Sequence, residues 1–301
     1  MVLTYNLSYL ITTRNRLPFL KITLEKLINE LQPDEEIIVV DGNSADGSKE
    51  YLQQLFDGGK IRQFISEPDK NQAHAWNKAM LMAKGALIKK IIDDDVYDYA
   101  AIRGCKEFML TNAWIDICIS NNLEGSLTEP ARIGITGRLP QYRQWKDGII
   151  KSFTFSDVSM LIRKSSLSFL GLYDTQFKMM DWEYALRVSY LQASIAYFTG
   201  YNALSVGTPG NITSTATKQL LKLEGRIGKI KYNYAGDGSE TSFYSQIKVE
   251  FGKLYSKRAG KKKIAAALAI IPADSQLKQV YALYYKKLED HNKTGEFNFL
   301  Y

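Results

Sequence analysis

The chain has few cysteines, few histidines and no long apolar run. Only 2 cysteines and 2 histidines occur in 301 residues, too few for a disulfide scaffold or a structural zinc site. Cys105 and Cys118 are therefore expected to be buried core thiols. The longest apolar stretch, 264–271, is far shorter than the roughly 18 residues of a bilayer-spanning helix. The first residues lack the features of a secretory leader, so we expect a cytoplasmic protein.

Positive charge is confined to one end of the chain. Residues 216–301 hold 16 Lys and Arg against 8 Asp and Glu, whereas residues 1–215 hold 23 against 24. The densest cluster lies at 257–263. Two interpretations stay open: a solvated helical face, or peripheral binding to the anionic inner face of the cell membrane. No nucleic-acid-binding motif accompanies the charge, so nucleic acid is not an expected partner.

The first hundred residues alternate between strand and helix patterns. Apolar runs at 7–12, 36–40, 61–65 and 86–92 predict strands, and helical spacing recurs in the segments between them. This alternation predicts an α/β fold, a three-layer sandwich around a mainly parallel sheet. Ligands of such sheets bind at the carboxyl ends of the strands. We therefore expect four loops to converge there, beginning at Thr13, Asp41, Ser66 and Asp93.

Beyond residue 97 the pattern is less regular. We expect helices over 99–109, 165–170 and 181–191 and strands over 115–119 and 158–162. Glycine and proline break the segment 121–160 into pieces without a clear prediction. Helical, basic composition follows 207–210 and places a boundary near residue 215. The predicted organisation is a domain over 1–215, with halves at about 1–97 and 98–215, and a helical basic region over 216–301.

Three adjacent aspartates, Asp93, Asp94 and Asp95, follow the strand predicted at 86–92. Adjacent carboxylates repel one another unless a positive group joins them. Mg²⁺ and Mn²⁺ prefer oxygen ligands and usually bridge one or two carboxylates to phosphate oxygens. A divalent cation is therefore expected, although an exposed turn that caps the next helix at Asp98 accounts for one of the three. By itself the string also fits a phosphatase or a nuclease.

Further motifs occur in order around this string. They are LITTRNR (10–16), EIIVVDGNSADGS (36–48), EPD (67–69), AWNKA (75–79), AKG (83–85), DDD (93–95), GLYD (171–174) and DWEYALR (181–187). Together they resemble the family 2 glycosyltransferases of GT-A fold, of the type found in bacterial polysaccharide biosynthesis. The resemblance covers about residues 5–215 and implies a Rossmann-like GT-A domain followed by the basic helical extension.

The resemblance also implies roles for individual residues. Asp93 and Asp95 would hold Mn²⁺ or Mg²⁺. The nucleotide sugar would be bound by Thr13, Arg14, Asp41, Asp69, Lys70, His74 and Asp94. The less favoured alternative for Asp41 is that it only begins an Asp-Gly turn. A lone histidine such as His74 is as often structural as functional.

Asp181 matches the acid that acts as general base in this family, although Asp is also a common helix N-cap. On a helix, Glu183 points about 200° away from Asp181 and cannot share its site. The acceptor side is assigned more weakly to Trp182, Glu183 and Arg187. Many relatives supply a histidine metal ligand after this helix. This sequence has no histidine there. Either water, a backbone carbonyl or an amide such as Asn202 would complete the coordination of the metal, or the metal would be weakly held.

The combined interpretation is an inverting, metal-dependent glycosyltransferase. It would move a single sugar from a nucleoside diphosphate donor to a hydroxyl of a glycan or lipid-linked acceptor, in surface polysaccharide or glycolipid assembly. The string QYRQW (141–145) differs in order and position from the motif of processive synthases, which favours single transfer. Two alternatives stay open: a nucleotide-sugar-binding protein with impaired catalysis, and a metal-dependent phosphohydrolase or nucleotidyltransferase.

Overall fold

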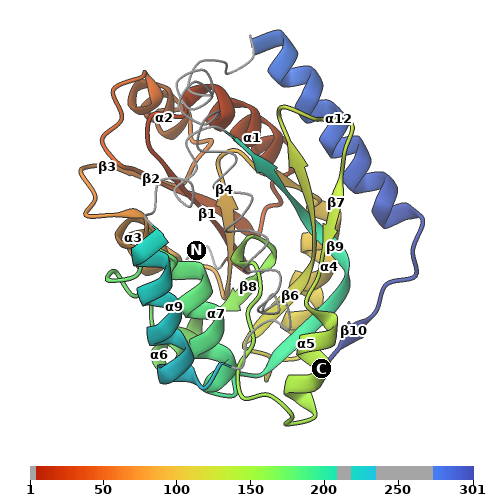
Figure 1. The fold of residues 1–301 in the computed structure, drawn as a ribbon. Coiled ribbons are helices and arrows are strands. Elements are labelled where there is room, and N and C mark those ends of the chain that lie inside the picture. Colours follow the sequence, from red (N-terminus) through yellow and green to blue (C-terminus); the bar gives the residue numbers. More distant parts are fainter. Residues whose placement is uncertain (1–4, 209–217, 235–273) are drawn as a thin grey trace, which may run out of the picture.

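The structure is a computed structural model that describes residues 5–208, 218–234 and 274–301. Its centre is a 10-stranded sheet of order β10-β9-β6-β8-β4-β1-β2-β3, with β5 paired to β9 and β7 to β6 (Figure 1). The strands are β1 Leu7–Thr13, β2 Glu35–Asp41, β3 Gln63–Ser66, β4 Leu87–Ile92, β5 Val96–Tyr97, β6 Ile117–Ser126, β7 Gly134–Thr136, β8 Leu161–Arg163, β9 Ile195–Gly207 and β10 Phe299–Leu300. The helices are α1 Leu17–Glu30, α2 Ser48–Asp57, α3 Gln72–Met82, α4 Tyr99–Thr111, α5 Leu139–Lys146, α6 Leu167–Leu170, α7 Met180–Tyr190, α9 Lys218–Tyr232 and α12 Asp274–Lys293.

The sheet separates two apolar cores because successive residues of a strand point to opposite faces. On β1, Tyr9 and Ile11 pack with α1 and α4, whereas Leu10 packs with α3 and α7 on the other face. Both predicted core thiols, Cys105 and Cys118, are buried in the first of these cores. Because both faces are covered, all seven residues of β2 are buried, and the strand has no solvent-exposed side. The predicted three-layer α/β sandwich is confirmed.

The parallel part of the sheet, β4-β1-β2-β3, brings four loops to one edge. Thr13 at the end of β1 lies opposite Asp41 at the end of β2, and Asp41 lies opposite Ser66 at the end of β3. Strand β4 pairs in parallel with β1 and ends just before Asp93. The four loops therefore converge as the sequence predicts. The other half of the sheet is mixed, because β8 runs antiparallel to both β4 and β6.

A close approach between β1 and the turn before β4 fixes the alignment of these two strands. The N–H of Gly85 donates a 2.8 Å hydrogen bond to Ser8 Oγ, which donates at 2.6 Å to Glu36 Oε1. A Cβ at Gly85 would lie 2.6 Å from the backbone nitrogen of Ser8, so only glycine allows this approach. The AKG motif thus positions β4 and the aspartates that follow it.

The segment 121–160, left unassigned by the sequence pattern, is partly regular. Strand β6 continues through 126, β7 covers 134–136, and α5 begins with Pro140 in its first turn, where proline is tolerated. The strand predicted at 158–162 is wrong in its start, because 157–159 form a 3-10 turn and β8 begins at Leu161. Strand β9 has no counterpart among the predicted strands; its pairing with β6 contains register shifts that disturb the alternating pattern.

The end of the chain belongs to the same packed unit. Helix α12 packs against α1, β5 and β9 and buries Leu277, Tyr281, Tyr284 and Leu288. The helical expectation for 216–301 holds for α9 and α12, whereas β10 is a strand that pairs antiparallel with β9. The expected boundary near residue 215 and the basic cluster at 257–263 lie outside the described residues. Within the described ranges, no helix has the length and apolar content needed to cross a bilayer.

A lysine is buried in the middle of β4. The Lys89 ammonium has no exposed surface; it donates to the carbonyl oxygen of Val158 and lies 3.4 Å from Asn202 Oδ1. It also lies 5.2 Å from the centre of the Tyr97 ring. Burial lowers the pKa of Lys89 to about 7, because desolvation penalises the charged form.

This lysine predicts a stability that rises with pH. Between about pH 7 and 9 the unfolded lysine keeps its proton while the native one loses it, so Lys89 should add up to about 1.4 kcal/mol per pH unit to the slope of the free energy of unfolding against pH. The Lys89→Met variant should lose this slope, as measured by urea unfolding across that range. The exposed Lys84→Met variant is the control for loss of one positive charge. Equal slopes in wild type and Lys89→Met would contradict the prediction.

Candidate functional site

A cavity of about 1010 Å³ lies at the edge where the four loops converge. The loop after β1, the loop after β3, the aspartates after β4 and the start of α7 all contribute to its wall. Eight of the residues predicted for the site line it: Thr13, Arg14, Asp69, Lys70, Asp93, Asp94, Asp95 and Asp181. Segments far apart in the sequence therefore form one polar chamber.

The three aspartates are buried and held in fixed positions. Thr13 Oγ1 donates to Asp93 Oδ2 at 2.7 Å, and Arg16 Nε lies 3.0 Å from Asp93 Oδ1. The Arg16 guanidinium also donates to Asp94, whose carboxylate accepts a second hydrogen bond from Thr208. Asp95 Oδ1 accepts from the backbone N–H of Val206 at 2.8 Å. Thr13 lines the cavity and also orients Asp93. Arg16 is the positive group that lies between the carboxylates of Asp93 and Asp94.

One guanidinium does not neutralise three adjacent acids. Burial, reinforced by Asp94, raises the pKa of Asp93 to about 7, even though Arg16 and Thr13 act in the opposite direction. Burial and the Asp94 charge also raise the pKa of Asp95 well above its usual range. Desolvation is the main cause at both positions. The cluster is therefore deficient in positive charge.

This donor set fits a divalent cation that is shared with a ligand. Carboxylate oxygens suit Mg²⁺ and Mn²⁺, which commonly take only one or two protein carboxylates and complete their shell with phosphate oxygens and water. Asp93 and Asp95 would supply these carboxylates. In the described part of the chain, no group of three or more His, Cys, Asp or Glu is arranged to hold a metal by itself. Asn202 cannot complete the set as suggested, because it is fully buried with Ser159 and does not line the cavity.

The nucleotide end of the site differs in detail from the expectation. Asp41 is fully buried, and its carboxylate accepts hydrogen bonds from Ser44 and from Ser66 Oγ, the latter at 2.6 Å. It stabilises the turn, while its neighbour Gly42 lines the cavity. Asp69 lines the cavity and pairs with Lys78 Nζ at 2.6 Å.

His74 supports this loop from outside the cavity. Its Nδ1 lies 3.3 Å from Asp69 Oδ1 and accepts from the backbone N–H of Lys70 at 3.4 Å. It is not among the residues that line the cavity.

Asp181 stands in the first turn of α7 and lines the cavity. Asp181 is exposed to the cavity. Desolvation by the surrounding protein and then the charge of Asp157 raise its pKa, and Lys90 acts in the opposite direction. Lys90 and Asp157 form a buried ion pair that also lines the cavity, and Tyr173 donates to the same carboxylate at 2.9 Å. Lys90 lies 4.4 Å from the centre of the Trp76 ring. A raised pKa is the property expected of a carboxylate that accepts a proton during catalysis.

The three residues assigned to the acceptor side do not line the cavity. Glu183 is fully buried and pairs with Arg187, at 3.0 Å from Oε1 to Nε. Arg187 also donates to the backbone carbonyl oxygens of Leu170 and Leu172. Trp182 packs edge-on against Tyr234, with ring centres 5.7 Å apart. As the helical spacing predicts, Glu183 lies away from Asp181, and these side chains fix α7 to its surroundings.

Sequence reasoning missed Arg16, Lys90 and Asp157. Arg16 lies within the first motif, but only the fold shows that it reaches two of the aspartates. Lys90, beside Lys89 in the middle of an apolar strand, was a visible signal, because a charged residue in a buried strand requires a partner. Asp157 falls in the segment without a clear prediction and carried no signal of its own.

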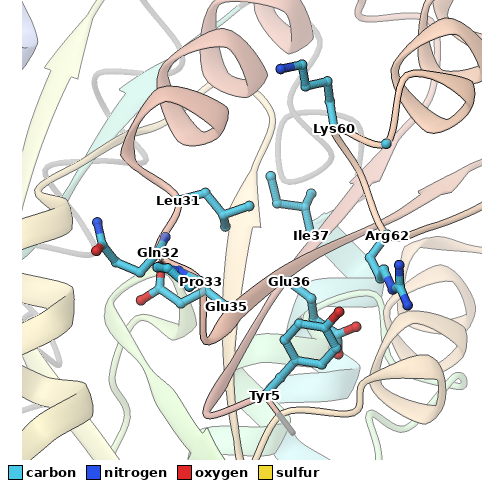
Figure 2. Close-up of a pocket in the computed structure, with 10 residues that line it drawn as sticks. Tyr5, Leu31, Gln32, Pro33, Glu35, Glu36, Ile37, Lys60 and Arg62 are labelled. Carbon is cyan, nitrogen blue, oxygen red and sulfur yellow. Dashed lines mark hydrogen bonds between the residues drawn. The ribbon is translucent and has the colours of Figure 1, made fainter. Parts of the chain in front are cut away.

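A second cavity, of about 360 Å³, lies at the opposite edge of the sheet, where β2 begins (Figure 2). The turn at 31–35 forms one side of it, and Tyr5, Lys60 and Arg62 form others. None of the residues predicted for the site lines it. The larger cavity is therefore the candidate site.

Comparison with known proteins gives one family and several similar structures. The family described as Glycosyl transferase family 2 matches residues 8–171. The structure of S. aureus TarS 1–349 in complex with UDP-GlcNAc is 14% identical, with a TM-score of 0.56, over 97% of this chain and 92% of that one. The mannosyltransferase PcManGT from Pyrobaculum calidifontis, in complex with GDP-Man and Mn²⁺, is 14% identical, with a TM-score of 0.50, over 93% and 87%. At 14% identity these two structures show the fold of this chain, which is the predicted GT-A fold. No curated protein sequence matches.

Loss of Arg16 should destabilise the protein. Arg16→Gln leaves two buried carboxylates without their cationic partner, and breaking such a pair costs about 3 kcal/mol or more. Urea unfolding near neutral pH measures the loss. Adding Asp93→Asn to Arg16→Gln should recover part of it, because one of the repelling charges is removed. The matched control is Arg14→Gln, an exposed arginine of the same loop. Equal stability of the two arginine variants would show that Arg16 does not hold the cluster together.

Proposed function

The chain belongs to glycosyl transferase family 2, and from that premise we propose that it transfers one sugar from a nucleoside diphosphate to an acceptor hydroxyl, with inversion and with a divalent cation. The observation that carries this proposal is the shared cavity. The aspartates after β4 and the carboxylate at the start of α7 line the same chamber. An inverting transfer requires a group that stabilises the leaving diphosphate and a base that accepts the proton of the acceptor hydroxyl.

The similar structures support the class of donor. One holds UDP-GlcNAc, and another holds GDP-Man with Mn²⁺. A nucleoside diphosphate sugar carries negative charge on its diphosphate. In this chain, Arg14 and Lys70 add positive charge to the wall of the cavity. We propose that both act at the nucleotide end of the site together with Thr13, Asp69 and Asp94, with Asp41 and His74 supporting the loops beneath.

Asp181 is proposed to accept the proton of the acceptor hydroxyl. The hydroxyl oxygen bonds to the anomeric carbon from the face opposite the diphosphate, while the bond from that carbon to the diphosphate oxygen breaks. The electron pair of the broken bond leaves with the diphosphate, so the configuration inverts. When bound by Asp93 and Asp95, Mn²⁺ or Mg²⁺ supplies Lewis-acid stabilisation of the charge on the leaving group. Asp181 then releases its proton to solvent.

The wider role is proposed from the chemistry of the site and the basic end of the chain. A single transfer to a glycan or lipid-linked acceptor, in surface polysaccharide or glycolipid assembly, suits an open cavity next to a cationic helix. A binding protein with impaired catalysis would bind donor without releasing nucleoside diphosphate. A phosphohydrolase or nucleotidyltransferase would release phosphate or pyrophosphate. Incubation with UDP-GlcNAc or GDP-Man and Mn²⁺, followed by product identification, separates these possibilities.

Removing the proposed base should separate catalysis from donor binding. Asp181→Asn should lower kcat by at least about 100-fold, because general base catalysis contributes 10²–10⁴-fold. Donor affinity, measured by calorimetry with Mn²⁺, should stay close to that of the wild type. Asp147→Asn, an exposed aspartate at the end of α5, is the control that should keep full activity. Undiminished turnover of Asp181→Asn would exclude Asp181 as the base.

The pH profile should depend on the neighbour of the base. Asp181 must be ionised to accept a proton, so kcat/KM should fall as pH falls through its raised pKa. Asp157 raises that pKa, and Asp157→Asn should therefore move the acidic limb of the profile to lower pH. Lys90 remains in this variant and favours the charged form of Asp181. An acidic limb that does not move, or that moves upward, would contradict this assignment.

A further inference from the structure

Helix α9 is fixed on the catalytic part of the molecule by one of its faces. It lies alongside α7 (Figure 1). The Glu224 carboxylate is buried and accepts hydrogen bonds from the backbone N–H groups of Lys178 and Met179, at 2.7 and 2.9 Å. At Gly228 the helix approaches so closely that a Cβ would lie 2.3 Å from the Trp182 ring. The inner face of α9 is thus held on the protein by hydrogen bonds at Glu224 and by close packing at Gly228.

The outer face of α9 is apolar and exposed. Leu223, Ile227 and Ile230 are 56%, 40% and 86% exposed. Their spacing of four and three residues puts them in one stripe along the helix. Isolated apolar residues are common on protein surfaces, but a continuous stripe of large ones indicates a binding surface.

The exposed charged residues described on α9 itself are all positive. Lys222, Arg226, Lys229 and Lys231 of α9 are exposed. The single acid of the helix, Glu224, points inward and is buried. Among the described residues of α9, the outer face therefore combines an apolar stripe with cations and carries no acidic side chain. This is the pattern of a helix that lies in the plane of a lipid surface, with its apolar side chains among the acyl chains and its cations at anionic headgroups.

We propose that the outer face of α9 binds an anionic membrane surface. The part of this proposal that concerns the acceptor rests on the proposed function: the acceptor would be a molecule presented at that membrane surface. The inner face of the same helix holds Lys178 and Met179, which line the cavity beside Asp181. A membrane bound to α9 would therefore lie next to the acceptor side of the cavity. The substrate class follows: a hydroxyl-bearing, lipid-linked acceptor.

Vesicle sedimentation of the full chain tests this surface. Vesicles of phosphatidylcholine with phosphatidylglycerol should bind the protein, and vesicles of phosphatidylcholine alone should bind it far less. The double variant Lys222→Glu/Arg226→Glu should weaken binding to the anionic vesicles by at least about tenfold. Ile230→Asp should weaken it independently, because an apolar side chain is lost. Lys49→Glu/Lys60→Glu and Ile149→Asp are matched exposed controls elsewhere and should bind like wild type.

Two further measurements distinguish a failure of the membrane proposal from a failure of the proposed function. Release of nucleoside diphosphate from the donor, measured without vesicles, should be the same in wild type and the α9 variants. Absence of this release in all proteins would contradict the proposed function but leave the result on vesicle binding intact. Equal vesicle binding by the α9 variants and the controls would overturn the membrane surface. So would self-association of the wild type, seen by analytical ultracentrifugation and abolished by Ile230→Asp.

Discussion

Burial of three consecutive carboxylates at the end of a strand is the constraint on which this structure depends. Charges out of water are costly unless they are paired and hydrogen-bonded. Here Arg16 and Thr13 reach the cluster from the loop after β1. Tyr281 of α12 donates to the backbone carbonyl oxygen of Asp94 at 2.6 Å. The acids thus connect the first strand, the fourth strand and the last helix, and they remain short of positive charge at the place where a nucleotide sugar would bring a metal.

The site is held from both sides by the C-terminal part of the chain. Helix α12 buries Tyr281 behind the aspartates, and α9 caps the loop before α7 through Glu224. Neither helix supplies a residue to the reacting centre as proposed. Both position it, so the basic end of the chain is a structural part of the catalytic unit as well as a surface. One face of α9 thus packs on the protein, and the other is the face that we propose binds a membrane surface.

Local sequence patterns predicted the parallel half of the sheet, where the strands pair without register shifts. The parallel strands β1 to β4 are mainly apolar and are followed by polar loops, so the convergence of those loops could be predicted directly. The pattern failed where pairing is irregular, as in β9 with its register shifts, and where a single turn replaces expected strand, as at 157–159. At the site, the three aspartates could be predicted because they directly follow a strand, where ligands of an α/β sheet bind. Partners such as Arg16 and Asp157 could not be assigned, because their contacts cross 78 and 67 positions of sequence.

The central claim is that Asp93 and Asp95 hold a divalent cation against the diphosphate of a sugar donor. A crystal grown with Mn²⁺ and UDP-GlcNAc or GDP-Man, with anomalous data collected at the manganese edge, tests it most directly. We expect a manganese peak at ligand distance from both carboxylates and from the diphosphate, with the sugar facing Asp181. A bound donor with no manganese at the aspartates, or with its sugar directed away from Asp181, would contradict it.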